Sequence, residues 1–126
     1  MKIYLFGNPN VEIDKLSFTV ADKLKPLIPS IEFISVKPNE DIPFDDKENV
    51  FIMDTIMGIT KVTLITENDL DKFQLPPRFS AHDFDLGFQL KYLKKLGKIK
   101  TFTIIGLPMN KKIDINLVVN KIKTFT

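Results

Sequence analysis

Cysteine is absent from this chain of 126 residues. Its absence excludes disulfides, thiolate metal sites and cysteine nucleophiles, and it is compatible with a reducing compartment. Long apolar runs are absent as well, because no stretch approaches the roughly 20 residues that a membrane-spanning helix requires. The strand-like run at residues 2–6 meets Gly7-Asn8-Pro9-Asn10 too early to be the core of a signal peptide. We therefore expect a cytoplasmic protein that does not associate with membranes.

A strong excess of charge of one sign is also lacking, because the net charge is +2 at pH 7. No aromatic residues alternate with the lysines, so the sequence does not indicate a nucleic-acid partner. Acidic residues are concentrated in residues 40–48 and lysines in residues 91–112. Two interpretations stay open: two solvated faces, or a basic surface that attracts an acidic protein partner.

What the chain does have is an ordinary globular composition, with 44% hydrophobic and 27% charged residues. No repeat, linker or low-complexity tract divides it. This length is enough to bury one core without covalent cross-links. We expect a single domain over residues 1–126.

Apolar patterns predict five strands, over residues 2–6, 31–36, 50–53, 61–66 and 101–105. Residues 50–53 form a short continuous apolar run, which is typical of a strand covered on both faces. Residues 31–36 are closer to strict alternation, which favours an edge or half-covered strand.

Helical spacing of apolar residues predicts three helices, over residues 14–24, 83–96 and 114–123. Pro26 indicates that the first helix ends near Lys25. Gly97 stands where a C-terminal cap of the second helix belongs, and Asp114 is the expected N-cap of the third. The inward-facing residues of the first and third helices are predicted to be Leu16, Val20, Leu24, Leu27, Ile115, Val118, Val119 and Ile122.

Strands that alternate with helices predict an α/β fold: a three-layer α/β/α sandwich around a mixed, mostly parallel sheet of about five strands. Residues 39–48 and 67–80 are interpreted as long surface connections, which are often functional in small domains. In such sheets, ligands bind beyond the carboxyl ends of the strands. Asp14, Asp54 and His82 are all expected at that edge.

Each of these three residues also has a structural interpretation. Asp14 suits the N-cap of the first helix, because aspartate accepts hydrogen bonds from free backbone N–H groups there. Asp54 directly follows a buried strand, where α/β proteins keep catalytic groups, but it also suits a turn before Gly58. His82 is the only histidine, and a lone histidine is often only packed or exposed.

Together, one imidazole and two carboxylates would form an oxygen and nitrogen site with an open position, suited to divalent zinc or nickel. Other motifs are weak: Gly7-Asn8-Pro9-Asn10 lacks the glycines of a dinucleotide loop, and there is no P-loop. Two groups of phenylalanines differ in their expected role. Those expected in the core are Phe18, Phe33, Phe51 and Phe102, and those that would contact a partner are Phe73, Phe79, Phe84 and Phe88.

Four motifs follow one another along almost the whole chain. The first strand leads to Gly7-Asn8 and then to an acidic residue, Asp14, before the first helix. The apolar strand at residues 50–53 leads to Asp54, and Gly58 follows. The other two motifs are a serine–x–histidine that opens an apolar helix ending in leucine–glycine, and a last strand that ends in isoleucine–glycine. Their residues are Ser80-Ala81-His82, Leu96-Gly97 and Ile105-Gly106.

In this order and spacing the chain resembles the endopeptidases that mature the large subunit of nickel–iron hydrogenases. The resemblance implies a phosphorylase/hydrolase-like α/β fold in which Asp14, Asp54 and His82 contact the metal. It further implies a monomer with no organic cofactor, whose partner is the hydrogenase large-subunit precursor. The nickel arrives with that precursor, and a C-terminal extension is removed once nickel is present. Asp54 or Asp14 would be the catalytic general base.

The chain departs from the family pattern at the first turn. Leu5 stands where the family has the first glycine of its turn, and Lys15-Leu16-Ser17-Phe18 replaces the glycines after the first acidic residue. If the turn aligns differently, Glu12 takes the place of Asp14. Two other functions stay open: a non-catalytic escort or assembly factor for a metalloenzyme subunit, and a small flavodoxin-like ligand-binding domain.

Overall fold

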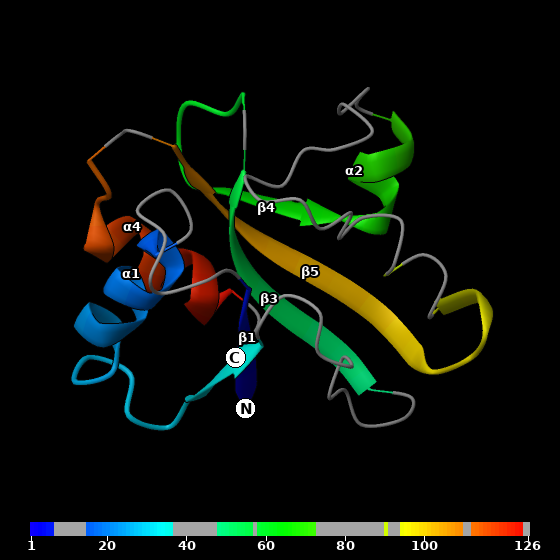
Figure 1. Cartoon of the computed structure of the whole chain (residues 1–126), viewed down its shortest axis with the longest axis horizontal. Coiled ribbons are helices and arrows are strands. Elements are labelled where there is room, and N and C mark those ends of the chain that lie inside the picture. The colour runs from blue at the N-terminus through cyan, green and yellow to red at the C-terminus, as the bar shows by residue number, and fades with distance from the viewer. Residues whose placement is uncertain are drawn as a thin grey trace.

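The computed structural model describes residues 1–6, 15–36, 48–56, 58–72, 90, 94–109 and 112–124, and the structural statements below concern these residues. They form one mixed sheet with helices, as the α/β prediction requires (Figure 1). The elements in chain order are β1 (Lys2–Phe6), α1 (Leu16–Leu24), β2 (Glu32–Val36), β3 (Glu48–Ile56), β4 (Thr63–Thr66), α2 (Glu67–Lys72), β5 (Ile99–Pro108) and α4 (Ile115–Lys123).

The sheet has five strands in the order β2-β1-β3-β5-β4. Every neighbouring pair is parallel except β4 with β5, which is antiparallel. The predicted mixed, mostly parallel sheet of five strands is therefore confirmed. The longest pairing joins β3 to β5, and Figure 1 shows these two strands side by side along their whole length.

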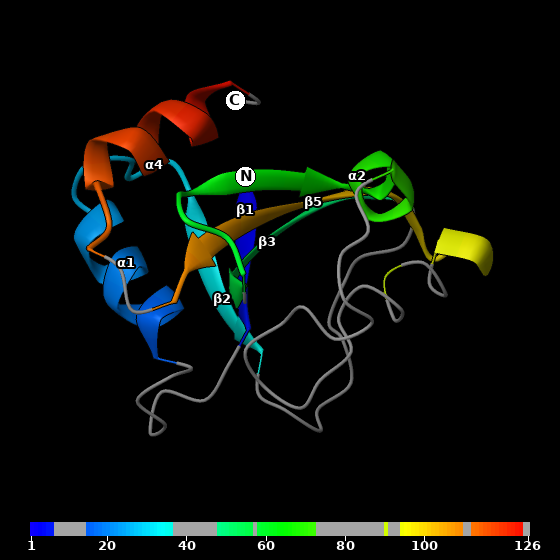
Figure 2. The ribbon, with the colours of Figure 1, turned by 90° about the horizontal axis from the view of Figure 1, so that it is seen from above.

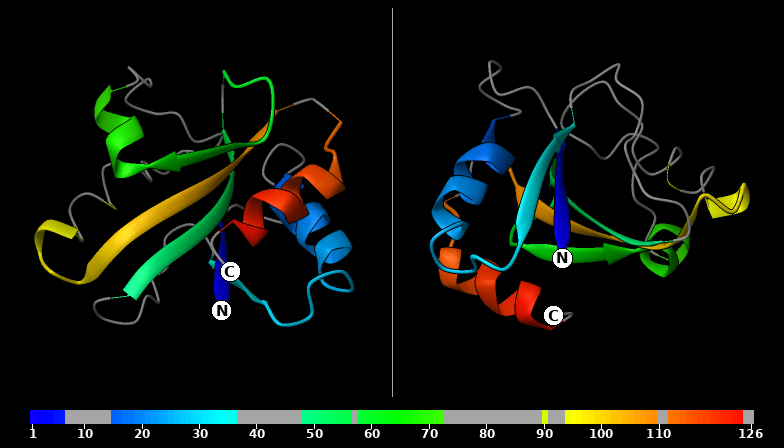
Figure 3. Two further views of the ribbon diagram at one scale, coloured as in Figure 1. Left: turned by 180° about the vertical axis from the view of Figure 1, so that it is seen from behind. Right: turned by 90° about the horizontal axis from the view of Figure 1, so that it is seen from below.

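Strand position follows the hydrophobic pattern. The continuous apolar run in β3 lies in the middle of the sheet, where Val50, Ile52 and Met53 are buried. The more alternating β2 is an edge strand beside β1, as predicted (Figure 3, right). A strand with apolar side chains on both faces is stable only where both faces of the sheet are covered. An edge strand tolerates exposed residues such as Glu32 and Ser35.

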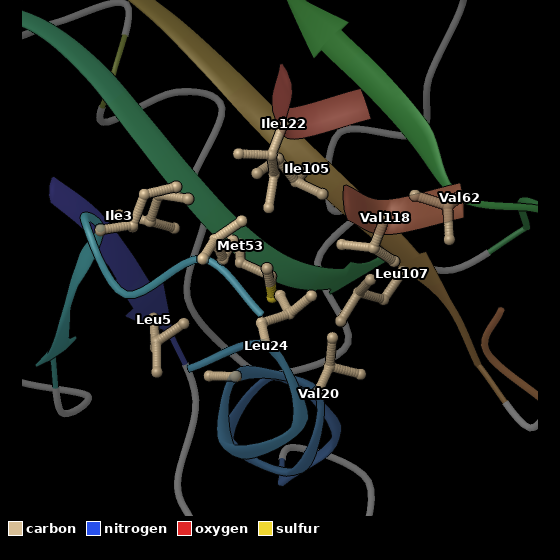
Figure 4. Close-up of a cluster of buried hydrophobic side chains, with 13 residues drawn as sticks. Ile3, Leu5, Val20, Leu24, Met53, Val62, Ile105, Leu107, Val118 and Ile122 are labelled. Atoms are coloured by element: carbon tan, nitrogen blue, oxygen red, sulfur yellow. The ribbon is translucent and has the colours of Figure 1, made fainter. Parts of the chain in front are cut away.

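One face of the sheet is covered by α1 and α4, which lie together on the same side (Figure 2). Figure 4 shows Leu24 of α1 beside Met53 of β3, Ile122 of α4 beside Ile105 of β5, and Val118 of α4 near Leu107 of β5. These side chains belong to one buried cluster, called here the α1 face, which also contains Ile3, Leu5 and Leu107. Burial of this apolar surface is the main force that holds the helices on the sheet.

The opposite face of the sheet has a second buried cluster, called here the β-face cluster. It contains Tyr4, Phe6, Ile52 and Ile56, together with Leu90, a helical residue that is fully buried. Leu90 belongs to the helix predicted over residues 83–96, most of which lies outside the described residues. The complete three-layer arrangement therefore stays a prediction.

Helix α1 begins two residues later than predicted and ends as predicted. Its N-cap position, which the sequence assigned to Asp14, is held by Lys15, without a side-chain cap hydrogen bond. Its C-cap is Lys25, directly before Pro26, which cannot continue a helix. The predicted inward position of Leu27 is wrong: the helix ends before it, and its side chain is 54% exposed.

The interpretation of residues 67–80 as a connection is wrong at its start, because α2 occupies Glu67–Lys72. The Asp69 carboxylate accepts hydrogen bonds from the backbone N–H of Thr66, at 2.8 Å, and from its hydroxyl, at 3.1 Å. A carboxylate at the third helical position that reaches back to the residue before the helix forms half of a capping box. Glu67 also forms an ion pair with Lys94.

Two predicted helix ends are confirmed. Gly97 has φ +75°, and its N–H donates to the carbonyl of Lys94 at 3.0 Å, as expected of a C-terminal cap. Asp114 is the N-cap of α4, and its Oδ1 accepts from the N–H groups of Asn116 and Leu117. Within the described part of the chain, none of the helices is long and apolar enough to cross a membrane.

Candidate functional site

The sheet changes its winding direction between β1 and β3. From β1 the chain passes through α1 to β2 on one side, whereas from β3 it proceeds to β4 and β5 on the other side. Two neighbouring parallel strands whose connections lead away in opposite directions leave a crevice at their carboxyl ends. Open α/β sheets bind ligands at this position, so the topology selects the carboxyl ends of β1 and β3.

Asp54 lies at this switch point. The register pairs Tyr4 with Ile52 and Leu5 with Met53, which are the β1–β3 pairs within the described residues. Strand β3 nevertheless continues beside β5, and Asp54 pairs with Gly106. The prediction that Asp54 directly follows the strand is therefore wrong, as is its interpretation as a turn residue. It is the residue of β3 directly after the last β1–β3 pair of the described residues.

The carboxylate of Asp54 is held inside the protein, since the residue is only 1% exposed. Its Oδ1 accepts a hydrogen bond from the backbone N–H of Thr55 at 2.8 Å. Burial of a carboxylate is costly unless hydrogen bonds compensate for the lost hydration. This bond also pairs a backbone N–H of β3.

Alternation along β3 sets the direction of the Asp54 side chain. Successive side chains of a strand point to opposite faces. Ile52 and Ile56 belong to the β-face cluster, and Met53 belongs to the α1 face. Asp54 therefore points to the same side as the β-face cluster, in a position that an apolar residue would ordinarily occupy.

Two hydroxyl groups on the other side of the sheet were not singled out from the sequence. Ser17 of α1 and Thr55 of β3 are buried, and their Oγ atoms have no hydrogen-bond partner among the described residues. Thr55 alternates with Asp54 and so shares the α1 face with Met53. Helical spacing could have identified Ser17 as buried, because it lies on the same helix face as Val20, Ala21 and Leu24.

The other two predicted site residues, Asp14 and His82, lie outside the described residues, as does the alternative Glu12. The described residues nearest to Asp14 and His82 in the chain can be placed in the fold. Lys15, which follows Asp14 in the chain, stands at the N-cap of α1. Leu90 follows His82 in the chain by eight residues and packs in the β-face cluster, on the side to which Asp54 points.

A metal site made only of described residues is not present: no group of three or more His, Asp or Glu side chains is close enough to hold an ion within that part of the chain. Since Asp14 and His82 are not in it, the three-residue site stays a prediction. Of the phenylalanines predicted in the core, Phe102 is buried in the β-face cluster, while Phe18, Phe33 and Phe51 are partly buried against the α1 face. The four phenylalanines predicted to contact a partner lie outside the described residues.

The lysines of residues 94–100 include both paired and exposed side chains. Lys94 pairs with Glu67, whereas Lys95, Lys98 and Lys100 are exposed. This distribution fits a solvated face, and the attraction of an acidic partner stays a prediction.

Comparisons of the chain with protein-family models, with curated proteins and with solved structures found no match.

Proposed function

We propose that this protein is an endopeptidase that recognises nickel in an immature nickel–iron hydrogenase large subunit and removes its C-terminal extension. The observation that supports the proposal most directly is the position of Asp54: a buried carboxylate on β3, directly after the last described pair with β1, at the switch point of the sheet. Asp54 also stands in one of the motifs by which the chain resembles the hydrogenase-maturation endopeptidases. In that pattern Asp54 contacts the metal of the substrate, together with Asp14 and His82.

The surroundings of Asp54 suit a general base. The Thr55 N–H holds one carboxylate oxygen in a defined direction. The apolar side chains of the β-face cluster limit access of bulk water on that side. A carboxylate held in this way can take a proton from a water molecule as the water oxygen bonds to the scissile carbonyl carbon. The proton then passes to the nitrogen that leaves, which completes hydrolysis of the peptide bond.

Recognition of the client would depend on the nickel it carries. Two carboxylates and an imidazole match the oxygen and nitrogen ligands that divalent nickel accepts, and three protein ligands leave coordination positions for the client's own groups. Binding energy from this contact would be absent with a nickel-free precursor. Cleavage would thus depend on whether metal insertion is complete. The proposal includes a cytoplasmic location and a monomeric state.

The test uses purified protein and the large-subunit precursor in nickel-loaded and nickel-free forms. Intact-mass spectrometry should show loss of a C-terminal peptide from the loaded form only. Asp54→Asn, which keeps the shape of the side chain, is the matched inactive variant.

Other outcomes would identify other functions. An escort would bind the precursor, measured by co-elution, and leave its mass unchanged. A ligand-binding domain would do neither. Either result would overturn the proposed protease activity.

A further inference from the structure

Gly106 is the residue of β5 that pairs with Asp54 in the parallel register. Paired residues of neighbouring strands point to the same face, so the Gly106 position lies beside the Asp54 side chain. Ile104, two residues earlier in β5, belongs to the β-face cluster and supports this assignment. Because glycine has no side chain, β5 places no side-chain atoms of its own next to the Asp54 carboxylate.

That place is filled by other residues. A Cβ atom added at Gly106 would lie 3.0 Å from Cγ1 of Ile56, 3.2 Å from Cδ1 of Ile59 and 3.2 Å from the carbonyl oxygen of Thr63. The backbone of Gly106 is not in the left-handed region, so conformational freedom does not explain the glycine. Close approach does, because two isoleucine side chains lie directly over the strand.

The atoms that an added Cβ would meet have little room to move away. Ile56 is fully buried, so its side chain has no solvent-filled space into which it could turn. The Thr63 carbonyl belongs to β4, which is paired with β5 at this position. A methyl group at residue 106 would therefore push Ile56, and Ile56 is two residues after Asp54 on the same strand and the same face. Displacement of one moves the other, since a packed interior transmits strain.

We infer that Gly106 is a positioning residue for Asp54: it allows Ile56 and Ile59 to close an apolar wall beside the carboxylate and so sets where that carboxylate stands. The catalytic consequence of this inference rests on the proposed function, whereas its structural part is independent of that function. A catalytic group displaced by a fraction of an ångström loses much of its rate advantage, so the position of this wall matters to the reaction.

The structural part is tested on the full chain labelled with ¹³C at the aspartate carboxyl carbon. The Asp54 resonance is assigned by its loss in Asp54→Asn. Gly106→Ala should shift this resonance. The matched control is Gly97→Ala, which also changes a glycine but whose added Cβ meets nothing within 4 Å. It should lower the unfolding temperature and leave the resonance in place. A folded Gly106→Ala protein with an unchanged Asp54 resonance would overturn the inference.

A second variant separates displacement from general loss of stability. Gly106→Ala combined with Ile59→Val adds one methyl group and removes Cδ1 of Ile59, which lies 3.2 Å from the added Cβ, so that one of the two isoleucine contacts is relieved. In this double variant the Asp54 resonance should return toward its original position and the unfolding temperature should recover. If Gly106→Ala does not fold, Ile59→Ala serves instead, because it removes the side chain that covers Gly106. An unmoved Asp54 resonance in that variant would contradict the inference equally.

The catalytic part is tested with the nickel-loaded precursor. Gly106→Ala should slow processing by a factor on the order of ten to a hundred relative to Gly97→Ala. Processing at the control rate would show that the wall does not position the reacting group. If the unaltered protein cleaves no precursor, the proposed function fails, while the resonance measurement still decides the structural part.

Discussion

Strand β3 has two neighbours, and it pairs with them over very different lengths. Beside β5 the ladder runs from Glu48 to Ile56, the whole of the strand. Beside β1 it consists of two pairs, at Ile52 and Met53. Among the described residues, β3 is therefore paired along its whole length on the β5 side and over only two residues on the β1 side.

Asp54 is a charged residue within an otherwise apolar strand. An unsatisfied buried polar group costs about 1–3 kcal/mol. The Asp54 carboxylate accepts a hydrogen bond from the backbone N–H of Thr55. The same residue thus completes the backbone hydrogen bonding and places a carboxylate at the switch point, and the predictions below separate these two roles.

Asp54→Asn should have the largest effect. The amide oxygen of asparagine can still accept the Thr55 N–H, so the free energy of unfolding should change by no more than about 1 kcal/mol. The negative charge is lost, so processing of the nickel-loaded precursor should fall by roughly 10²-fold or more. Urea denaturation and intact-mass kinetics measure the two effects. Full activity would mean that Asp54 only completes the backbone hydrogen bonding.

Asp14→Asn and His82→Ala should also abolish processing, by removing two of the three contacts to the client's nickel. Their circular dichroism spectra and unfolding temperatures should stay close to those of the unaltered protein. Glu12→Gln is the matched control for Asp14, since it changes a nearby carboxylate. Loss of activity in Glu12→Gln with retention in Asp14→Asn would reassign the first acidic contact.

Met53→Ala tests the opposite side of the same strand. Met53 is fully buried against Leu24 of α1, in the α1 face. Truncation should lower the free energy of unfolding by about 2–5 kcal/mol, because it removes buried apolar atoms and leaves a cavity. Denaturant titration provides the value. A loss below about 1 kcal/mol would mean that α1 can move inward to fill the space.

Thr55→Val should have the smallest effect. The Thr55 hydroxyl is buried without a partner among the described residues, and valine has nearly the same shape. The free energy of unfolding should stay constant or rise by up to about 1 kcal/mol, because an unsatisfied polar group is removed. Ser17→Ala is the companion variant on α1. A clear loss of stability in Thr55→Val would mean that an ordered water molecule bonds the hydroxyl.

Most of the fold could be predicted from local patterns. The continuous apolar run at residues 50–53 indicated a central strand, and Gly97 and Asp114 indicated helix ends. These signals are reliable because each depends only on residues within one helical turn or one strand. The prediction missed α2, although Thr66 and Asp69 have the spacing of a capping box, because the segment has no apolar stripe.

The candidate site was predictable only in part. Residue type and spacing selected Asp54, but they placed it after the strand. Strand β3 continues because β5 runs beside it to Pro108, and that pairing joins residues about fifty positions apart. The convergence of Asp14 and His82 with Asp54 stays a prediction.

The sequence by itself determined most of the elements, the helix ends at Gly97 and Asp114 and the side of each strand that is apolar, since these depend on residues a few positions apart. Only the tertiary structure decided that Asp54 is buried, that it stands within β3 between β1 and β5, and that Gly106 is confined by Ile56, Ile59 and Thr63. The reason is physical: burial, register and close contact depend on which distant strands become neighbours, and no local pattern specifies that.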